Sequence, residues 1–212
     1  MKQFNEKIEE NTFHENIETI YLHENYKLEI NYLPKNTKEL CGVNSNITCL
    51  KQLLNLKYIN FSLDFKGNIN FDELPDNLEI LAPSFNSKII NNNSRKLKYI
   101  IAYSFNLENL FAENLYIDYY FIKNLCEFYR NFDNIYIYAN DKNTLVDINT
   151  KDFEKEEIIE SENLIIGNNV IYYSDNFKYY IMKINSSEKI KIKNEIENLK
   201  NQIVELEIKL KN

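Results

Sequence analysis

Glycine and proline are scarce in this chain, with three of each among 212 residues, and tryptophan is absent. So few chain breakers exclude a collagen-like repeat and a proline-rich disordered segment. Three cysteines make a poor disulfide framework, so we interpret them as small buried residues in a reducing cytoplasm. The first ten residues lack the apolar core of a secretion signal, and no apolar run is long enough to span a membrane as a helix.

Positive charge is also limited. The chain carries 25 Lys and Arg against 32 Asp and Glu, a formal net charge of -7, and its basic residues form no cluster. An acidic balance disfavours non-specific binding to phosphate backbones. We therefore expect a partner that is neither nucleic acid nor a membrane.

Residues that build common catalytic and metal sites are sparse. His14 and His23 are the only histidines, and neither has the spacing of a zinc-binding helix. The run from Asp141 to Asp147 lacks the glycine and the terminal glutamate of a calcium loop. Neither a glycine-rich phosphate loop nor a Gly-x-Ser-x-Gly elbow occurs. We expect a protein that is not an enzyme and that uses no metal or cofactor.

The main positive signal is a repeat of leucine and isoleucine about every twenty residues. The unit that begins at Ile17 reads Ile-x-x-Ile-x-Leu-x-x-Asn, and the unit from Leu56 reads Leu-x-x-Ile-x-Phe-x-x-Asp. Seven units begin at positions 17, 37, 56, 78, 97, 115 and 135, with spacings of 20, 19, 22, 19, 18 and 20 residues. These spacings lie near the lower end of the leucine-rich-repeat range.

Two of the units share a second motif. Leu33-Pro34-Lys35-Asn36 and Leu74-Pro75-Asp76-Asn77 each lead into an apolar segment, and the second copy continues to Phe85-Asn86-x-x-Ile89. Over about residues 15–140 the chain resembles the FNIP-type repeat, a relative of the leucine-rich repeat. The resemblance implies a solenoid with one short parallel strand per unit, and it implies macromolecular recognition, because related repeats serve in adaptor proteins.

The expected fold class is therefore α/β, a leucine-rich-repeat solenoid with a parallel sheet of short strands. Its return segments include two that favour short helices, residues 48–55 and 121–132. Three apolar runs near the C-terminus predict a β-meander that caps the last unit, at residues 164–166, 170–173 and 179–184. We divide the chain into an N-terminal cap at 1–16, the solenoid at 17–140, a C-terminal cap at 141–184 and a coiled-coil helix at 185–212.

The last segment is predicted to be a coiled-coil helix. Asn185 with Glu188 three residues later is typical of a helix start, and the apolar residues that follow are spaced 4, 3, 4, 3 and 4 apart. An isolated helix of this length has marginal stability in water. We therefore expect it either to pack against its own solenoid or to dock to a partner helix, for example in a homodimer. The seam residues are Ile192, Ile196, Leu199, Ile203, Leu206 and Leu210.

Outward positions three, five and seven of each unit would form the concave face of such a solenoid. Tyrosine recurs there, and tyrosine is enriched in binding hot spots. The alternative is that a tyrosine-rich composition scatters this residue everywhere, and a one-residue error in register would turn the side chains inward. The candidate binding residues are Tyr21, Tyr58, Tyr99, Ile101, Tyr103 and Tyr119.

From the sequence we expect a non-enzymatic protein–protein interaction module. It would bind a protein partner through the concave face and self-associate or dock through the C-terminal helix. The alternative is a structural scaffold that the coiled coil assembles and whose concave face has no specific ligand.

Overall fold

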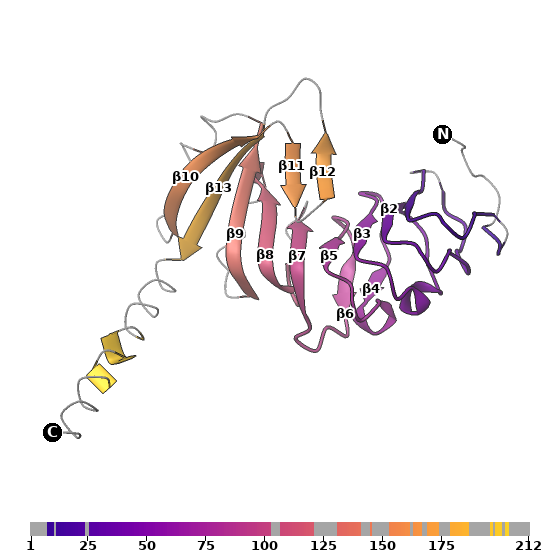
Figure 1. Ribbon diagram of the computed structural model, residues 1–212, viewed down its shortest axis with the longest axis horizontal. Coiled ribbons are helices and arrows are strands. Elements are labelled where there is room, and N and C mark those ends of the chain that lie inside the picture. The colour runs from indigo at the N-terminus through magenta and orange to yellow at the C-terminus, as the bar shows by residue number, and fades with distance from the viewer. Residues whose placement is uncertain are drawn as a thin grey trace.

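The computed structural model shows a mostly-β, parallel solenoid whose main sheet has nine strands (Figure 1). The structure describes residues 8–10, 12–23, 26–102, 107–120, 131–140, 145, 153–161, 163–166, 169–173, 179–186, 196, 198–200 and 202–203. In sheet order the strands are β1 (Thr19–Tyr21), β2 (Glu39–Val43), β3 (Tyr58–Phe61), β5 (Ile80–Ala82), β7 (Lys96–Ala102), β8 (Phe111–Asp118), β9 (Phe132–Ala139), β13 (Tyr179–Ser186) and β10 (Phe153–Ser161).

The first five predicted units are confirmed in register. The fourth residue of each unit pairs with the fourth residue of the next in successive parallel strands, and all of these side chains are buried. Stacking such units buries a continuous apolar interior that no single unit could close. The paired residues are Ile20, Leu40, Ile59, Leu81 and Ile100.

The opposite wall of the solenoid is also made of strands. β4 (Asn68–Asn70) and β6 (Lys88–Ile90) form a second parallel sheet, and Ile30 and Ile47 form a parallel bridge in the turns before them. Ile69 and Ile89, the central residues of these strands, are buried. Side chains from both walls therefore pack into the same apolar interior.

The α/β expectation is wrong for the return segments that the structure describes. The helix predicted for residues 48–55 is a single 3-10 turn, η1 (Leu50–Gln52), and the next unit contains a similar turn, η2 (Phe71–Glu73). A unit of about twenty residues that supplies two wall strands and their corners has little chain left for an α-helix, which rises only about 1.5 Å per residue. The helix predicted at 121–132 falls outside the described residues up to 130, and Phe132 begins β9.

Gly42 forms a bulge in β2 that changes which side chains enter the interior. Cys41 pairs with Asn60, whereas Val43 pairs with Phe61, so Gly42 is the extra residue. Its φ is 73°, and a Cβ at this position would collide with the carbonyl oxygen of Leu22. The bulge turns Val43 into the interior, although the seventh position was expected to face outward.

The last two predicted units are wrong in register by three residues. Leu115 pairs with Ile100, and Ile135 pairs with Leu115, so both occupy the fourth position and not the first. The units therefore begin at Ala112 and Phe132. The unit that begins at Leu97 is short, and the next unit begins with a small alanine, Ala112. The apolar Leu115, three residues later, was therefore mistaken for the first residue of that unit.

The C-terminal strands do not form the predicted simple meander. β11 (Asn163–Ile166) and β12 (Asn169–Tyr173) pair as a separate antiparallel hairpin. β13 instead inserts antiparallel between β9 and β10. In this position the alternation of β13 buries Met182 and Ile184 in the solenoid interior.

The helix predicted to start at Asn185 does not begin there, because β13 extends to Ser186. The described residues that follow, 196, 198–200 and 202–203, are helical. Ile196, Leu199 and Ile203 are 47%, 52% and 56% exposed, so packing of this helix against its own solenoid is not seen at these positions. Ile192, Leu206 and Leu210 lie outside the described residues. A single chain provides no second helix, so the coiled-coil prediction has no structural support. Within the described part of the chain, we find no helix long and apolar enough to cross a membrane.

Candidate interaction surface

The sheet has a second apolar side, which we call the outward face, pointing away from the solenoid interior. Alternate residues of a strand point to opposite sides, so positions three and five of each unit lie on it. The centre of the outward face is itself buried. Its buried residues are Cys41, Tyr58, Ile80, Ala82, Ile101 and Tyr138.

Because the centre of the outward face is buried, some of the candidate binding residues are buried and others are accessible. Tyr58 and Ile101 are only 5% and 0% exposed, so they stabilise the outward face and are not accessible to a partner. Tyr21, at the β1 edge, is 67% exposed, and Tyr99 is half-buried. Tyr103 lies outside the described residues.

Tyr119 does not reach the outward strand positions at all. Because of the three-residue shift, it follows the end of β8, where it packs partly against the interior. Its ring meets that of Tyr120 edge-on, with centroids 5.6 Å apart. The same shift brings Tyr116 and Tyr136 to the fifth positions of their units, which sequence reasoning missed. Their spacing of 20 residues was the available signal.

Three half-buried tyrosines form a ladder across β7, β8 and β9, which we call the tyrosine ladder: Tyr99, Tyr116 and Tyr136. Tyr116 and Tyr136 are cross-strand partners, and their rings stack with centroids 4.6 Å apart and planes 12° apart. Tyr99 and Tyr116 are diagonal neighbours at 6.5 Å with a 50° tilt. Lys98 Nζ lies 5.6 Å from the centroid of the Tyr99 ring. Rings in mutual contact form a rigid aromatic surface.

Two asparagines hold the strands of the tyrosine ladder in register. Asn134 Nδ2 donates to Asn114 Oδ1 at 3.1 Å, and Asn114 Nδ2 donates to the Lys98 carbonyl oxygen at 3.1 Å. Each asparagine stands two residues before a ladder tyrosine on the same side of its strand. The amide chain therefore fixes the spacing of the rings that follow.

Tyr116 of the tyrosine ladder and the thiols of Cys41 and Cys49 are uncharged at neutral pH. Burial, with smaller contributions from Tyr136 and Tyr99, raises the pKa of Tyr116 to about 12. Burial, with Glu39 nearby, raises the pKa of the Cys41 thiol to about 12, and burial raises that of Cys49 to about 11. The arrangement can offer apolar area and hydroxyl hydrogen bonds, whereas neither thiol is a ready nucleophile.

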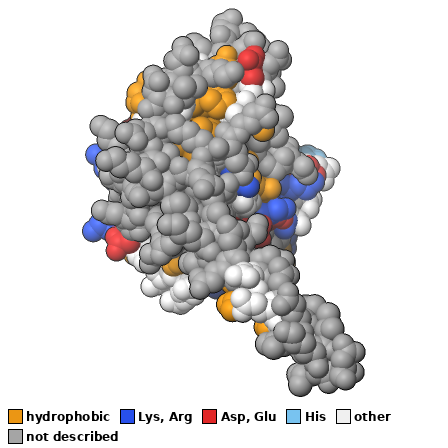
Figure 2. All heavy atoms as spheres, turned by 90° about the vertical axis from the view of Figure 1, so that its left-hand side faces the viewer, with side chains coloured by type: hydrophobic (Ala, Val, Ile, Leu, Met, Phe, Trp, Pro, Cys, Tyr) orange, Lys and Arg blue, Asp and Glu red, His pale blue; other side chains and the backbone are white. Residues whose placement is uncertain are grey.

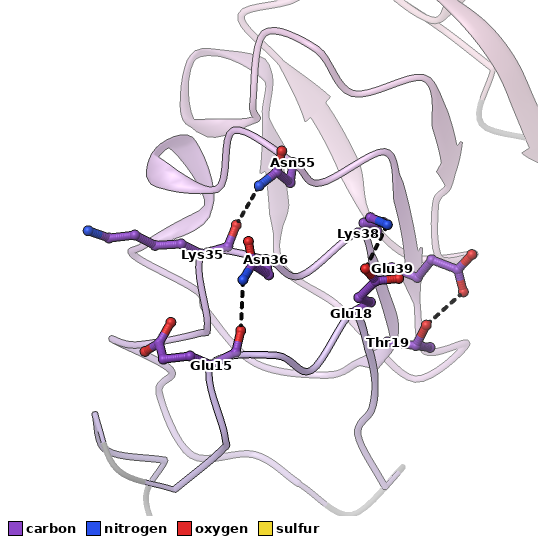
Figure 3. Close-up of polar contacts among 8 residues, drawn as sticks. All are labelled: Glu15, Glu18, Thr19, Lys35, Asn36, Lys38, Glu39 and Asn55. Carbon is purple, nitrogen blue, oxygen red and sulfur yellow. Dashed lines mark hydrogen bonds and ion pairs between the residues drawn. The ribbon is translucent and has the colours of Figure 1, made fainter.

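At the entry to the first strands, side chains join one turn to the next (Figure 3). Asn36 Nδ2 donates to the Glu15 carbonyl oxygen and Asn55 Nδ2 to the Lys35 carbonyl oxygen, both at 3.1 Å. Asn77 continues this row by donating to the Leu54 carbonyl oxygen. We call these three residues the asparagine row.

Charged side chains form a parallel row beside the asparagine row. Lys38 Nζ lies 2.7 Å from Glu18 Oε1 (Figure 3), and Lys57 Nζ lies 2.8 Å from Glu79 Oε1. These contacts are largely exposed and link neighbouring turns, so we assign this rim a structural role.

A family model described as FNIP Repeat matches residues 4–41. The matched segment ends within β2 and includes the Leu33-Pro34-Lys35-Asn36 motif, whose asparagine belongs to the asparagine row. Comparisons with curated proteins and with solved structures find no match.

The FNIP match and the tyrosine ladder lie in different parts of the solenoid. The match covers β1 and the start of β2, whereas the tyrosine ladder occupies β7 to β9. In Figure 1 these groups of strands stand at opposite ends of the parallel part of the sheet. The candidate surface is therefore a feature of this chain's later turns and does not come from the matched repeat.

Proposed function

We propose that this protein is a non-enzymatic interaction module that binds a protein partner at the tyrosine ladder. A repeat-built solenoid is a common scaffold for protein recognition. The observation that carries the proposal is the set of three partly exposed rings held in contact on adjacent strands. Because these rings are already ordered, binding would cost little side-chain entropy, which is why tyrosine is effective in binding surfaces.

The chemistry of the ladder suggests its partner. Stacked rings that carry hydroxyl groups favour a segment that brings aliphatic or proline side chains together with hydrogen-bond acceptors. Lys98, which lies beside Tyr99 and 3.7 Å from Glu79 Oε2, and Lys183, the cross-strand partner of Tyr136, stand at two borders of the ladder. We infer a protein partner whose docking segment is largely apolar, and neither a nucleic acid nor a membrane.

We infer that the repeats are of the leucine-rich type, because positions one, four and six supply the interior in several units. We also place the protein in the cytoplasm, where Cys41 and Cys49, both buried free thiols, would remain reduced. No metal or cofactor enters this proposal.

The test compares partner capture by matched variants. Full-length protein is used as bait for proximity labelling in cells, beside Tyr99→Ser/Tyr136→Ser and a control, Tyr120→Ser. Tyr120 is highly exposed but lies beyond the end of β8. We expect the double variant to lose captured partners by about tenfold or more and the control to keep them. Unchanged capture by a double variant with native thermal unfolding would reject the tyrosine ladder as the binding surface.

A second candidate function, self-assembly through the C-terminal helix, rests on the three exposed seam residues. Ile196, Leu199 and Ile203 fall three and four residues apart on helical backbone, which places them on one face. A parallel dimer would bury this face, and a scaffold assembled in this way would not need the tyrosine ladder.

Light scattering separates these two functions. We expect the full chain to be a dimer, and both Leu199→Glu/Ile203→Glu and a chain ending at Asn185 to be monomers. Equal monomer masses for all three proteins would remove the self-assembly proposal and leave the binding proposal intact.

A further inference from the structure

The nine-stranded sheet ends at β10 with an unpaired edge. β10 pairs antiparallel with β13, and among the described strands none pairs with its other side. In Figure 1, β10 is the last strand of the sheet on the side away from β2. An edge strand exposes a row of backbone N–H and C=O groups that can pair with another chain.

Apolar rows from both sides of the sheet end at two neighbouring residues of β10. On the outward face, Tyr138 pairs with Ile181 and Ile181 with Ile159, and exposure rises along this row from 3% at Tyr138 to 64% at Ile159. On the interior side, buried Met182 pairs with half-buried Ile158. One further strand would cover both isoleucines.

Only a short, well-defined part of the β10 edge is regular enough to pair with an incoming strand. The register with β13 shifts between Lys155 and Ile158, and from Ile158 to Ser161 the pairing is regular. A bulge interrupts pairing along an edge, so the regular four residues after it form the segment available to an incoming strand. Figure 2 views the molecule from the β10 side and shows apolar side chains grouped in the upper part of this face.

The charge pattern of β10 opposes pairing with a second copy. The strand reads Phe-Glu-Lys-Glu-Glu-Ile-Ile-Glu-Ser, with four glutamates and one lysine. Pairing β10 with β10 of a second copy would bring these glutamates close to the glutamates of the other strand. Like charges directly opposite each other destabilise a sheet, so the sequence favours a partner strand of the opposite charge.

We propose that the β10 edge accepts an extended segment of a partner protein as a tenth strand of the sheet. That segment carries two consecutive apolar residues opposite Ile158 and Ile159, followed by Lys or Arg opposite Glu160, so that all three contacts lie within the regular part of the edge. Backbone hydrogen bonds supply affinity in this mode, and the alternating side chains supply specificity. This surface is separate from the tyrosine ladder, and the proposal does not rest on it.

The test uses two synthetic nine-residue peptides, one centred on Lys-Val-Val-Lys and one on Glu-Val-Val-Glu, titrated with the full-length protein by fluorescence anisotropy. We expect the basic peptide to bind at least about tenfold more tightly than the acidic one. Glu160→Lys should reduce this preference, whereas Glu108→Lys, an exposed position outside the sheet, should leave it unchanged. Methylating the backbone nitrogens of the basic peptide should abolish binding, because strand addition needs those donors.

Three results would overturn the proposal. The first is no binding of the basic peptide up to the order of 1 mM. The second is a preference that the charge reversal leaves unchanged in a variant with native circular dichroism. The third is loss of a dimer in Ile159→Asp, measured by light scattering, because the occupant of the edge would then be a second copy of the chain.

Discussion

The early and late turns of the solenoid use the same interior but different outward side chains. β1, β2, β3 and β5 are three to five residues long, and their entry turns are joined by the asparagine row and by exposed ion pairs. β7, β8 and β9 are seven or eight residues long, and they carry the tyrosine ladder and its amide chain. One repeat can therefore hold its turns together with polar rim contacts or present a rigid aromatic surface, depending on residues that do not enter the core.

The early turns depend most strongly on Gly42. Gly42→Ala places a methyl group against the Leu22 carbonyl oxygen at a φ of 73°, so the backbone must shift at the bulge. We expect a loss of about 3 kcal/mol in the free energy of unfolding, measured by urea denaturation. Lys66→Ala, at an exposed position, is the control and should change stability by less than about 0.5 kcal/mol. A stable Gly42→Ala protein would show that the bulge is not where the structure places it.

The asparagine row and the amide chain beside the tyrosine ladder lie in different turns, so a substitution in one should not affect the other. Asn55→Ala removes one bond to the Lys35 carbonyl oxygen, and Asn134→Ala removes its bonds to Asn114 and to the Glu113 carbonyl oxygen. We expect each substitution to cost about 1 to 2 kcal/mol. Hydrogen exchange should speed up mainly in β2 and β3 for the first variant and in β8 and β9 for the second, because solenoid units contact only their neighbours. Equal effects in both regions would mean that the solenoid unfolds as one unit.

A stabilising substitution is expected at Thr37. This residue is fully buried at the first position of its unit, where the other units carry apolar residues, and its hydroxyl has no hydrogen-bond partner within the part of the chain that the structure describes. Thr37→Val keeps the shape and removes the unsatisfied group, so we expect a gain of about 1 kcal/mol by thermal or urea unfolding. Thr48→Val, which loses a bond to Asn31, is the contrasting control. A loss of stability in Thr37→Val would imply a partner for the hydroxyl.

The smallest effect is expected at the ion pairs of the rim. The hydrogen bond from Lys57, assisted by Lys98, lowers the pKa of Glu79. Because the folded-state pKa is below the unfolded one, this contribution is present at neutral pH and disappears as pH falls through and below the ordinary glutamate range. The pair is largely exposed, so Glu79→Gln should cost only a few tenths of a kcal/mol at pH 7, and the wild type and variant should converge near pH 3. A difference that persists at pH 3 would have another cause.

The repeat and the register of its first five units could be predicted from the sequence, because a constant spacing of apolar residues indicates both where each strand lies and which residues of the next strand it pairs with. The prediction was wrong where that spacing changes. The unit before Ala112 is too short for the general spacing, so the register shifted and Tyr119 was chosen in place of Tyr116. The sequence also did not indicate that Tyr58 and Ile101 are buried. A residue's position on the outward side of a strand does not show whether other side chains cover it. The pairing of β13 with β9 is a long-range choice that local alternation leaves open.

The register between β7 and β8 is the most direct test of this account, because it brings the tyrosine ladder together. Tyr99 pairs with Asn114, which sets Lys98 beside Glu113, whereas the spacing read from the sequence would set Lys98 beside Tyr116. Neighbouring strands lie about 4.8 Å apart, within the range that a disulfide can bridge. In a Cys126→Ser background, Lys98→Cys/Glu113→Cys should form an intramolecular disulfide under mild oxidation, and Lys98→Cys/Tyr116→Cys should not. The opposite result, by mass spectrometry of the digested protein, would contradict both the register and the proposed surface.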